Sequence, residues 1–377
     1  MDCDYLIVGA GFFGSVLAER IANDLGAHVV VVEKRNHIGG NCYSKVDRAT
    51  GIEYHPFGTH IFHTSSLEVW EYIRSFMELN YYHHQVLTTH KGRAYQMPIN
   101  LETINTFFSQ NFRPNQAKAF IQQQALAEKI KEPKNMEEKG IATIGRPLYE
   151  AFIRNYTIKQ WGKDPRDLPA SIVNRLPVRF NYDESYFHDG RWQGIPLEGY
   201  TSVFERLLNS RKIEVKLSCD FLKHRKEFHV RKKIIYSGPL DRFFDYKYGR
   251  LEWRSITCTK RLIHEGDFQG TSVMNYADLD TPYTRIHEPR HLHPERQYGQ
   301  DKTIIFYEYA HDQKNDDGYY PINTVQNQEL AAKYKKLALK DKQLIIGGRL
   351  GNYAYYDMDK VILEALRCYK EHIKTLV

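Results

Sequence analysis

The architecture of this chain follows from residues 5–34, which read YLIVGAGFFGSVLAERIANDLGAHVVVVEK. Residues 5–8 predict a short buried strand, residues 15–25 carry apolar side chains at helical spacing, and residues 29–32 predict a second strand. The turn between the first strand and the helix has the pattern G-x-G-x-x-G. This combination predicts a βαβ unit that binds a dinucleotide.

The glycines of the turn and one acidic residue have distinct tasks in such a unit. Gly9 permits the tight turn, Gly11 lets backbone approach a pyrophosphate, and Gly14 allows the helix to pack closely on the strand. The helix N-terminus supplies positive potential for the phosphates. Glu33 lies 24 positions after Gly9, where a strand-end carboxylate can accept hydrogen bonds from ribose hydroxyls.

A second pair of glycines narrows the choice of cofactor. Residues 33–40 read EKRNHIGG, which is the Glu-Lys-Arg-x-x-x-Gly-Gly extension seen in FAD proteins of the glutathione-reductase-like superfamily. In those proteins the loop wraps the diphosphate, and NAD dehydrogenases usually lack it. We therefore expect FAD.

The pattern of a buried strand followed by glycines returns near the C-terminus. Residues 345–351 read IIGGRLG, so Arg349 can bring a cation to the flavin side of the cofactor. Asp357 directly precedes the closing helix predicted over residues 360–373, and it either caps that helix or contacts the ribityl chain of the flavin. Both roles are compatible.

We predict an α/β fold in which a discontinuous Rossmann-like FAD-binding domain carries an inserted helical bundle and an antiparallel β-sheet domain. Helical spacing dominates residues 67–161, and alternating strand-like segments occur at 179–187, 254–259 and 303–309. Residues 223–233 alternate basic with apolar side chains and predict a solvated hairpin. The expected divisions are 1–80, 195–242 and 321–377 for the FAD domain, 99–178 for the helical domain with a mobile substrate loop, and 81–98, 179–194 and 243–320 for the sheet domain.

Composition restricts the classes of partner. The net charge of +7 over 377 residues suits an anionic ligand, but no dense basic run or basic helix indicates nucleic acid. Five scattered cysteines without a Cys-x-x-Cys pair predict neither a zinc site nor a disulfide framework, and they favour the cytoplasm. No apolar run is long enough for a membrane span. The 27 Tyr and 19 Phe indicate either core packing or a site that stacks planar rings.

Several further motifs occur in a fixed order along the chain. They are GTHIFHT (58–64), LYEAFIRNYTIKQWG (148–162), LPASIVNRLPVRFNYDESYF (168–187), YSGPLD (236–241), MNYADLDTPYTRIHE (274–288), YYPI (319–322) and GRLGNYAYYDMD (348–359). With these motifs the chain resembles the UDP-galactopyranose mutases over nearly its whole length. That combination is far more specific than a glycine turn.

The resemblance implies roles for individual residues. Arg175 and Arg285 would hold the substrate diphosphate, because a guanidinium pairs bidentately with phosphate oxygens and stays charged. His60 would lie beside the flavin ring, whereas His63 is interpreted as structural. The other substrate contacts expected are Tyr186, Tyr320 and Tyr355 at the phosphates, Phe152, Tyr156, Thr157 and Trp161 around the uracil, Asn275 at the nucleotide, and His84 at the sugar. The expected FAD contacts are Gly9, Gly11, Phe12, Phe13, Gly14, Glu33, Lys34, Gly40, Asn41, His60, Ile61, Gly238, Arg349, Tyr356, Asp357 and Met358.

An alternative applies to the uracil pocket. Leu148, Phe152 and Tyr156 follow helical i, i+4, i+8 spacing, so they also fit a core-facing stripe.

The resemblance also implies a reaction. In this family reduced FAD forms a bond from N5 to the anomeric carbon of the hexose, UDP leaves, and the sugar recloses as the other ring form with no net redox change. The substrate would be a UDP-sugar, an external reductant such as NAD(P)H would keep the flavin reduced, and the chain would form a homodimer. No metal is expected.

Two positions differ from the form associated with galactose. Thr59 stands where Gly-Pro-His is common, and His84 stands where an asparagine near the sugar is expected. The hexose could therefore be galactose or an N-acetylated, 6-deoxy or epimeric relative. Neutral drift at two tolerant positions is the other explanation.

Two other protein classes share the FAD fold. An oxidoreductase of the amine-oxidase or desaturase type would be reduced by its substrate during turnover. A GDP-dissociation inhibitor would bind a protein partner and would have lost the flavin site, whereas this chain keeps Gly9, Gly11, Gly14, Glu33 and Arg349.

Overall fold

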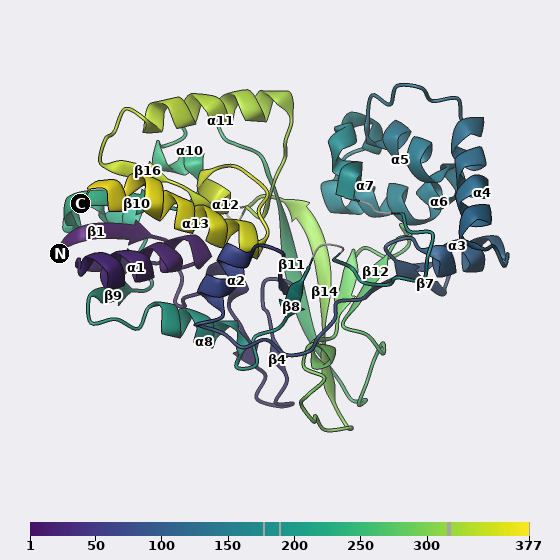
Figure 1. The fold of residues 1–377 in the computed structure, drawn as a ribbon, viewed down its shortest axis with the longest axis horizontal. Coiled ribbons are helices and arrows are strands. Elements are labelled where there is room, and N and C mark those ends of the chain that lie inside the picture. Colours follow the sequence, from purple (N-terminus) through teal and green to yellow (C-terminus); the bar gives the residue numbers. More distant parts are fainter. Residues whose placement is uncertain (176–177, 188–189, 315–317, 377) are drawn as a thin grey trace.

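The computed structural model describes residues 1–175, 178–187, 190–314 and 318–376 (Figure 1). Its N-terminal part is the predicted βαβ unit, in which β1 (Asp2–Val8) leads through the glycine turn into α1 (Phe12–Leu25) and then β2 (Val29–Val32). The strand and helix predictions for this segment are confirmed.

A five-stranded parallel sheet contains this unit, in the order β16-β10-β1-β2-β9. The strands that complete it come from distant segments, namely β9 (Ile213–Lys216), β10 (His229–Tyr236) and β16 (Leu344–Ile346). Alternate residues of β2 show why both faces are covered: Val29 and Val31 pack against α1, α8 (Gly199–Leu207) and α13 (Met358–His372), while Val30 and Val32 pack against Phe221 and Phe228.

The hairpin predicted over residues 223–233 is wrong. Its first part lies in α9 (Phe221–His224) and a 3-10 turn, and its second part is the beginning of β10, which pairs with β1 and β16. The first half of β10 is largely exposed, and only its apolar end is buried. A half-exposed strand of a parallel sheet therefore carries the charge pattern of a surface hairpin.

A seven-stranded sheet lies beside the first one, in the order β15-β11-β14-β13-β12-β6-β7 (Figure 1). All its pairings are antiparallel except that of β12 with β6. The strands predicted at residues 254–259 and 303–309 are confirmed. The strands are β6 (Val86–His90), β7 (Arg93–Met97), β11 (Trp253–Ile263), β12 (Val273–Tyr276), β13 (Arg285–His287), β14 (Thr303–Asp312) and β15 (Tyr320–Pro321).

The strand predicted over residues 179–187 is wrong, because this segment is irregular. Its backbone makes isolated hydrogen bonds, from the Arg179 N–H to the Ile99 carbonyl and from the Leu101 N–H to the Asn181 carbonyl, each 2.9 Å. The buried guanidinium of Arg179 donates to the carbonyls of Asp183 and Ser185. These local bonds curl the segment around one side chain instead of aligning it with a neighbouring strand.

The helical segment forms a lobe to the right of the two sheets in Figure 1. Its core contains an aromatic cluster around Phe107 and Phe152, whose ring centroids are 5.4 Å apart. The helical segment predicted over residues 67–161 contains a π-helical turn near its end. The elements are α3 (Leu101–Phe108), α4 (Pro114–Ala127), α5 (Met136–Ile144), α6 (Arg146–Leu148), the π turn (Tyr149–Arg154) and α7 (Asn155–Trp161).

Short elements connect these parts. The two-stranded pairing of β5 (Phe62–Thr64) with β8 (Trp192–Gly194) joins segments from different divisions of the chain, and the proposed domain boundaries stay a prediction. Within the described ranges, no helix is both long and apolar enough to cross a membrane. The remaining helices and strands are β3 (Lys45–Val46), β4 (Glu53–Tyr54), α2 (Leu67–Ile73), α10 (Leu240–Phe243), α11 (Val325–Ala338) and α12 (Gly348–Gly351).

Candidate active site

A cavity of about 410 Å³ runs from the carboxyl ends of β1, β2 and β10 to the inner face of the seven-stranded sheet. Ligands of open α/β sheets bind outside the carboxyl ends of the strands, because helix N-termini and loops converge there. Every residue expected to contact the cofactor lines this cavity except Gly14, although their roles stay predictions.

The dinucleotide end of the cavity is a backbone cradle. Gly9 has φ of +108°, and a Cβ on it would lie 2.2 Å from the Ser237 hydroxyl oxygen. In the described chain no side chain caps the first turn of α1, so its N–H groups remain available to an anion. Glu33 is buried, and its two oxygens accept hydrogen bonds from the backbone N–H groups of Ala10 and Arg35, each 2.9 Å. The carboxylate thus fixes the turn that the phosphates would approach.

The other end of the cradle is aromatic and cationic. The Arg349 guanidinium lies over the rings of Tyr320 and Tyr355, 5.1 Å and 4.8 Å from their centroids, and these rings stack on each other. Its buried Nε finds no hydrogen-bond acceptor among the described residues. Asp357 occupies the N-cap position of α13, but in the described chain its side chain accepts no capping hydrogen bond and lines the cavity instead. Asp357 therefore has the predicted N-cap position without a side-chain capping bond, and the ribityl interpretation stays a prediction.

His60 is held in one orientation. Its Nδ1 is 2.7 Å from the Gly58 carbonyl, which can only accept, so Nδ1 carries the proton and Nε2 is an acceptor. The His60 backbone N–H donates to Nδ1 of His55 at 3.0 Å. Burial lowers the pKa of His60 to about 4, so the ring is neutral near pH 7. A neutral histidine at this place can accept a hydrogen bond from a ligand.

The sheet side of the cavity supplies a second cation. Arg285 Nε donates to the Tyr156 hydroxyl at 2.8 Å and lies 3.8 Å from Glu308 Oε1. Burial alone would raise the pKa of Glu308, but Arg285 and His287 outweigh burial and lower it to about 2. The carboxylate is therefore ionised, and it keeps the guanidinium in place.

The predicted substrate residues divide into two groups. Arg285, Tyr186, Tyr320, Tyr355, Asn275, His84 and His60 all line the cavity. The buried Oδ1 of Asn275 has no partner in the described part of the chain, as expected of an atom that awaits a ligand. Arg175 ends a 3-10 helix (Ala170–Arg175), and its side chain lies outside the described residues.

The uracil-pocket residues do not line this cavity in the described structure. Phe152 is 3% exposed and packs edge-on against Tyr95 and Phe107 in the core of the helical lobe, as the alternative interpretation expected. Thr157 is also buried, and Tyr156 reaches the site only through Arg285. Their role around uracil stays a prediction, together with that of Trp161.

Sequence reasoning missed several titratable residues of the cavity, among them His63, His287 and Glu308. His63 was interpreted as structural, yet it lines the cavity and stacks on Phe187 with the ring centroids 3.7 Å apart. Glu308 and His287 were not considered. The register that pairs Arg285 with Glu308 brings them together, and strand periodicity places His287 on the same face as Arg285.

Comparison with known proteins agrees with this geometry. Residues 151–355 match the family model for UDP-galactopyranose mutase, and residues 7–76 match that for an NAD(P)-binding Rossmann-like domain. The chain is 42% identical over 372 residues to "Probable UDP-galactopyranose mutase" of Klebsiella pneumoniae, covering 98% of this chain and 95% of that protein.

This chain belongs to the UDP-galactopyranose mutase family.

Other members and solved structures support the same family and fold. "dTDP-fucopyranose mutase" of Escherichia coli is 36% identical over 374 residues, with 98% of each chain covered. A crystal structure of reduced UDP-galactopyranose mutase has a TM-score of 0.75 at 13% identity and covers 100% of this chain and 96% of its own, which supports the fold alone. Family membership and the Rossmann-like unit support a flavin cofactor, and they favour neither the oxidase class nor the GDP-dissociation inhibitors.

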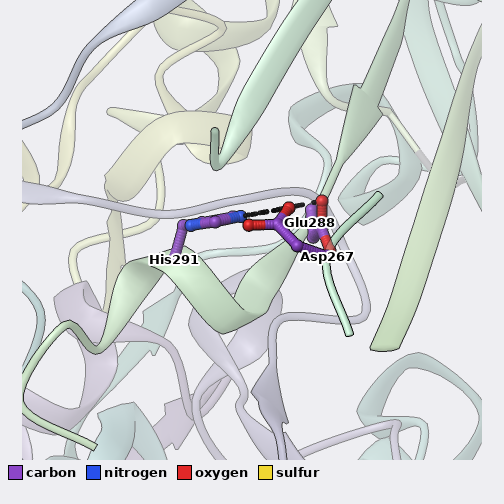
Figure 2. Close-up of side chains that lie close together, drawn as sticks. All are labelled: Asp267, Glu288 and His291. Atoms are coloured by element: carbon purple, nitrogen blue, oxygen red, sulfur yellow. Dashed lines mark hydrogen bonds and ion pairs between the residues drawn. The ribbon is translucent and has the colours of Figure 1, made fainter. Parts of the chain in front are cut away.

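A cluster outside the cavity has the composition of a metal site. Figure 2 shows Asp267, Glu288 and His291, whose ligand atoms lie within 4.8 Å of one another. Their atoms are already used: Glu288 accepts from the backbone N–H groups of Phe268 and Gln269 and from a threonine hydroxyl, and His291 Nε2 bonds to Asp267 at 3.1 Å. The cluster is an ion-pair network that holds the loop before β12 against the sheet.

The first prediction concerns the glycine turn of this mutase-family chain. A Cβ at Gly14 would lie 2.0 Å from the Gly9 carbonyl oxygen, so Gly14→Ala must push α1 away from the turn. We expect at least a roughly tenfold loss of bound flavin, measured by absorbance of the purified protein. Gly26→Ala is the control, because its φ of +61° strains the other end of the same helix while its Cβ meets open space and leaves the turn untouched. Equal flavin content in both variants would contradict the claim that the glycine turn binds the cofactor.

The second prediction concerns the cluster of Figure 2. Burial opposes protonation of His291, but Glu288 and Asp267 outweigh it and raise its pKa. The stability from this pair is therefore complete below the unfolded pKa of about 6.5 and is lost as pH rises through the folded value. His291→Gln should cost about 1 kcal/mol of unfolding free energy near pH 5.5 and little near pH 8.5. An equal loss at both pH values would show that the histidine is not charged.

Proposed function

We propose that this protein interconverts the pyranose and furanose forms of a UDP-linked hexose, with UDP-galactose as the first candidate, using reduced FAD bound in the cavity. One observation carries the proposal: a dinucleotide cradle and a guanidinium site bordered by tyrosines share a single cavity. Relatives named UDP-galactopyranose mutase at 34% and 42% identity over nearly the whole chain support it.

The residues that hold the diphosphate would do most of the protein's share of the chemistry. Reduced FAD, when bound, supplies the nucleophile for the anomeric carbon. Arg285 would stabilise the charge of the departing UDP, because a buried, preorganised cation acts more strongly there than in water. The hydroxyls of Tyr186, Tyr320 and Tyr355 would donate to the same phosphates. Arg175 would approach from the loop after the helical lobe.

The remaining contacts would hold the cofactor and exclude water. Glu33 would accept from a ribose hydroxyl with the lone pairs that Ala10 and Arg35 leave unused. His60 and Arg349 would lie along the flavin, with the neutral His60 Nε2 as an acceptor. We further propose that an external reductant such as NAD(P)H reduces the flavin and that the chain acts in the cytoplasm as a homodimer.

A second candidate substrate is a 6-deoxyhexose nucleotide, favoured by the 36% identity to dTDP-fucopyranose mutase over 98% of the chain. The third prediction separates the candidates. We expect the dithionite-reduced protein to turn over UDP-galactose faster than UDP-N-acetylgalactosamine or a 6-deoxyhexose nucleotide, with furanose products detected by NMR. A preference of more than roughly tenfold for the 6-deoxy sugar would reverse the assignment.

The fourth prediction concerns the phosphate clamp. Arg285→Ala should lower kcat/KM by about 10²–10³-fold and leave the bound flavin unchanged, since the residue would act on charge that develops in the substrate. Arg285→Lys should recover only part of the loss because an ammonium lacks the bidentate fork. Arg261→Ala removes an exposed arginine from β11 of the same sheet and is the control. Near-normal activity of Arg285→Ala would refute the clamp.

A further inference from the structure

A chain of hydrogen bonds runs from the buried carboxylate of the sheet to the surface of the cavity. His287 Nε2 lies 3.0 Å from Glu308 Oε2, and His287 Nδ1 lies 2.8 Å from the Thr59 hydroxyl oxygen. Thr59, His287 and Glu308 all line the cavity, while His287 and Glu308 are 3% and 2% exposed. Thr59 lies in a loop 228 residues before His287, whereas His287 and Glu308 lie on the paired, consecutive strands β13 and β14.

We propose that this Thr59–His287–Glu308 chain turns Thr59 into a fixed acceptor that recognises one hydroxyl of the substrate's hexose. The proposal rests on the mutase function given above and adds a specificity-determining residue to it. His287 and Glu308 would be positioning residues, because they act only through Thr59.

The direction of the bond to Glu308 follows from the chemistry of the carboxylate, and the direction of the bond to Thr59 is part of the proposal. An ionised carboxylate only accepts, and Arg285 and the Thr284 hydroxyl surround Glu308 with further positive or donor groups. The proton shared with Glu308 must therefore sit on His287 Nε2. With only Nε2 protonated, as the proposal requires, Nδ1 of His287 carries a lone pair and takes the Thr59 hydroxyl proton. The Thr59 oxygen has no proton left to offer the cavity and presents lone pairs.

The position of the Thr59–His287–Glu308 hydrogen-bond chain indicates that its ligand is the sugar. Arg285, the proposed phosphate ligand, lies 3.8 Å from Glu308, and two further hydrogen bonds lead from that carboxylate to Thr59. Thr59 is also adjacent in sequence to His60, the proposed neighbour of the flavin. A group between the diphosphate and the flavin occupies the place of the hexose.

The neutral imidazole of His84 completes this side of the cavity. Burial, with Arg285 and His287 nearby, lowers the pKa of His84 to about 3, and its Nδ1 bonds to the Tyr82 hydroxyl at 2.8 Å. The Tyr82 hydroxyl also bonds to Ser272. Both unusual positions found in the sequence, Thr59 and His84, thus present polar atoms to the cavity and are hydrogen-bonded to residues behind them.

The test is a cycle of variants and substrates. UDP-galactose analogues with fluorine in place of the hydroxyl at C2, C3 or C6 lose one donor each, and C4 is left intact because its hydroxyl must close the furanose ring. We expect Thr59→Val to lower kcat/KM on UDP-galactose by about 10–100-fold but to have little further effect on one of the three analogues. For each analogue, the ratio of wild-type to Thr59→Val kcat/KM is compared with the same ratio for UDP-galactose. This comparison removes the intrinsic effect of fluorine on the reaction.

Two further variants distinguish loss of sugar recognition from a general structural defect. Thr59→Ser keeps the hydroxyl and should restore most of the activity, while His287→Phe should reproduce the same analogue-specific coupling more weakly. Thr257→Val is the matched control, because Thr257 bonds to His311 at 2.9 Å on the exposed part of the same sheet. It should show no coupling with any analogue.

A failure of the Thr59 inference can be distinguished from a failure of the proposed mutase function. Flavin-loaded Thr59→Val with coupling below about twofold at all three positions would overturn the inference while leaving the mutase function standing. A wild-type protein that makes no furanose from UDP-galactose or a 6-deoxy nucleotide would instead overturn the function. If the 6-deoxy sugar is preferred, the same comparison of Thr59 variants is made with its C2- and C3-fluoro analogues, because this sugar has no C6 hydroxyl. Coupling at one of these two positions would support the inference, and its absence would overturn it.

Discussion

The buried carboxylate of Glu308 organises the candidate site. A charge with almost no access to water must be paired, and this one is paired on two sides, by the guanidinium of Arg285 and by the ring of His287. The pairing with Arg285 orients its guanidinium toward the proposed site of the substrate diphosphate. The second reaches Thr59 at the place of the sugar. One buried charge therefore orients groups that face two parts of the same ligand.

The carboxylate can do this because the two sheets meet at the cavity. The parallel sheet brings the carboxyl ends of β1, β2 and β10 to one side, where backbone N–H groups and glycines accept a dinucleotide. The seven-stranded sheet places Arg285 and Glu308 opposite each other across β13 and β14. The discontinuity of the Rossmann-like part thus has a consequence for function, since the chain leaves the cofactor unit to build the substrate side and returns with β16 and Arg349.

The parts predictable from sequence are those with a local signal. The βαβ unit and β16 have the predicted type and nearly the predicted ends, because glycine turns and apolar periodicity encode them locally. The hairpin at 223–233 failed because a half-exposed strand shows surface charge, and the strand at 179–187 failed because Arg179 captures the backbone carbonyls. Glu308 was missed because only the register of β13 with β14 brings it to Arg285, and His287 was missed although it lies two residues after Arg285 on the same strand. Phe152 shows a different limit. Apolar residues at helical spacing are expected both in a protein core and in a ligand pocket, so the spacing alone could not place Phe152 in the core of the helical lobe.

The most direct test of this account is a crystal structure of the flavin-loaded, reduced protein with UDP-galactose. The account predicts the cofactor diphosphate at the N-terminus of α1, the substrate diphosphate on Arg285, and the hexose between them with its anomeric carbon facing the flavin and one hydroxyl on Thr59. A substrate diphosphate bound away from Arg285, or a hexose remote from both Thr59 and the flavin, would contradict it.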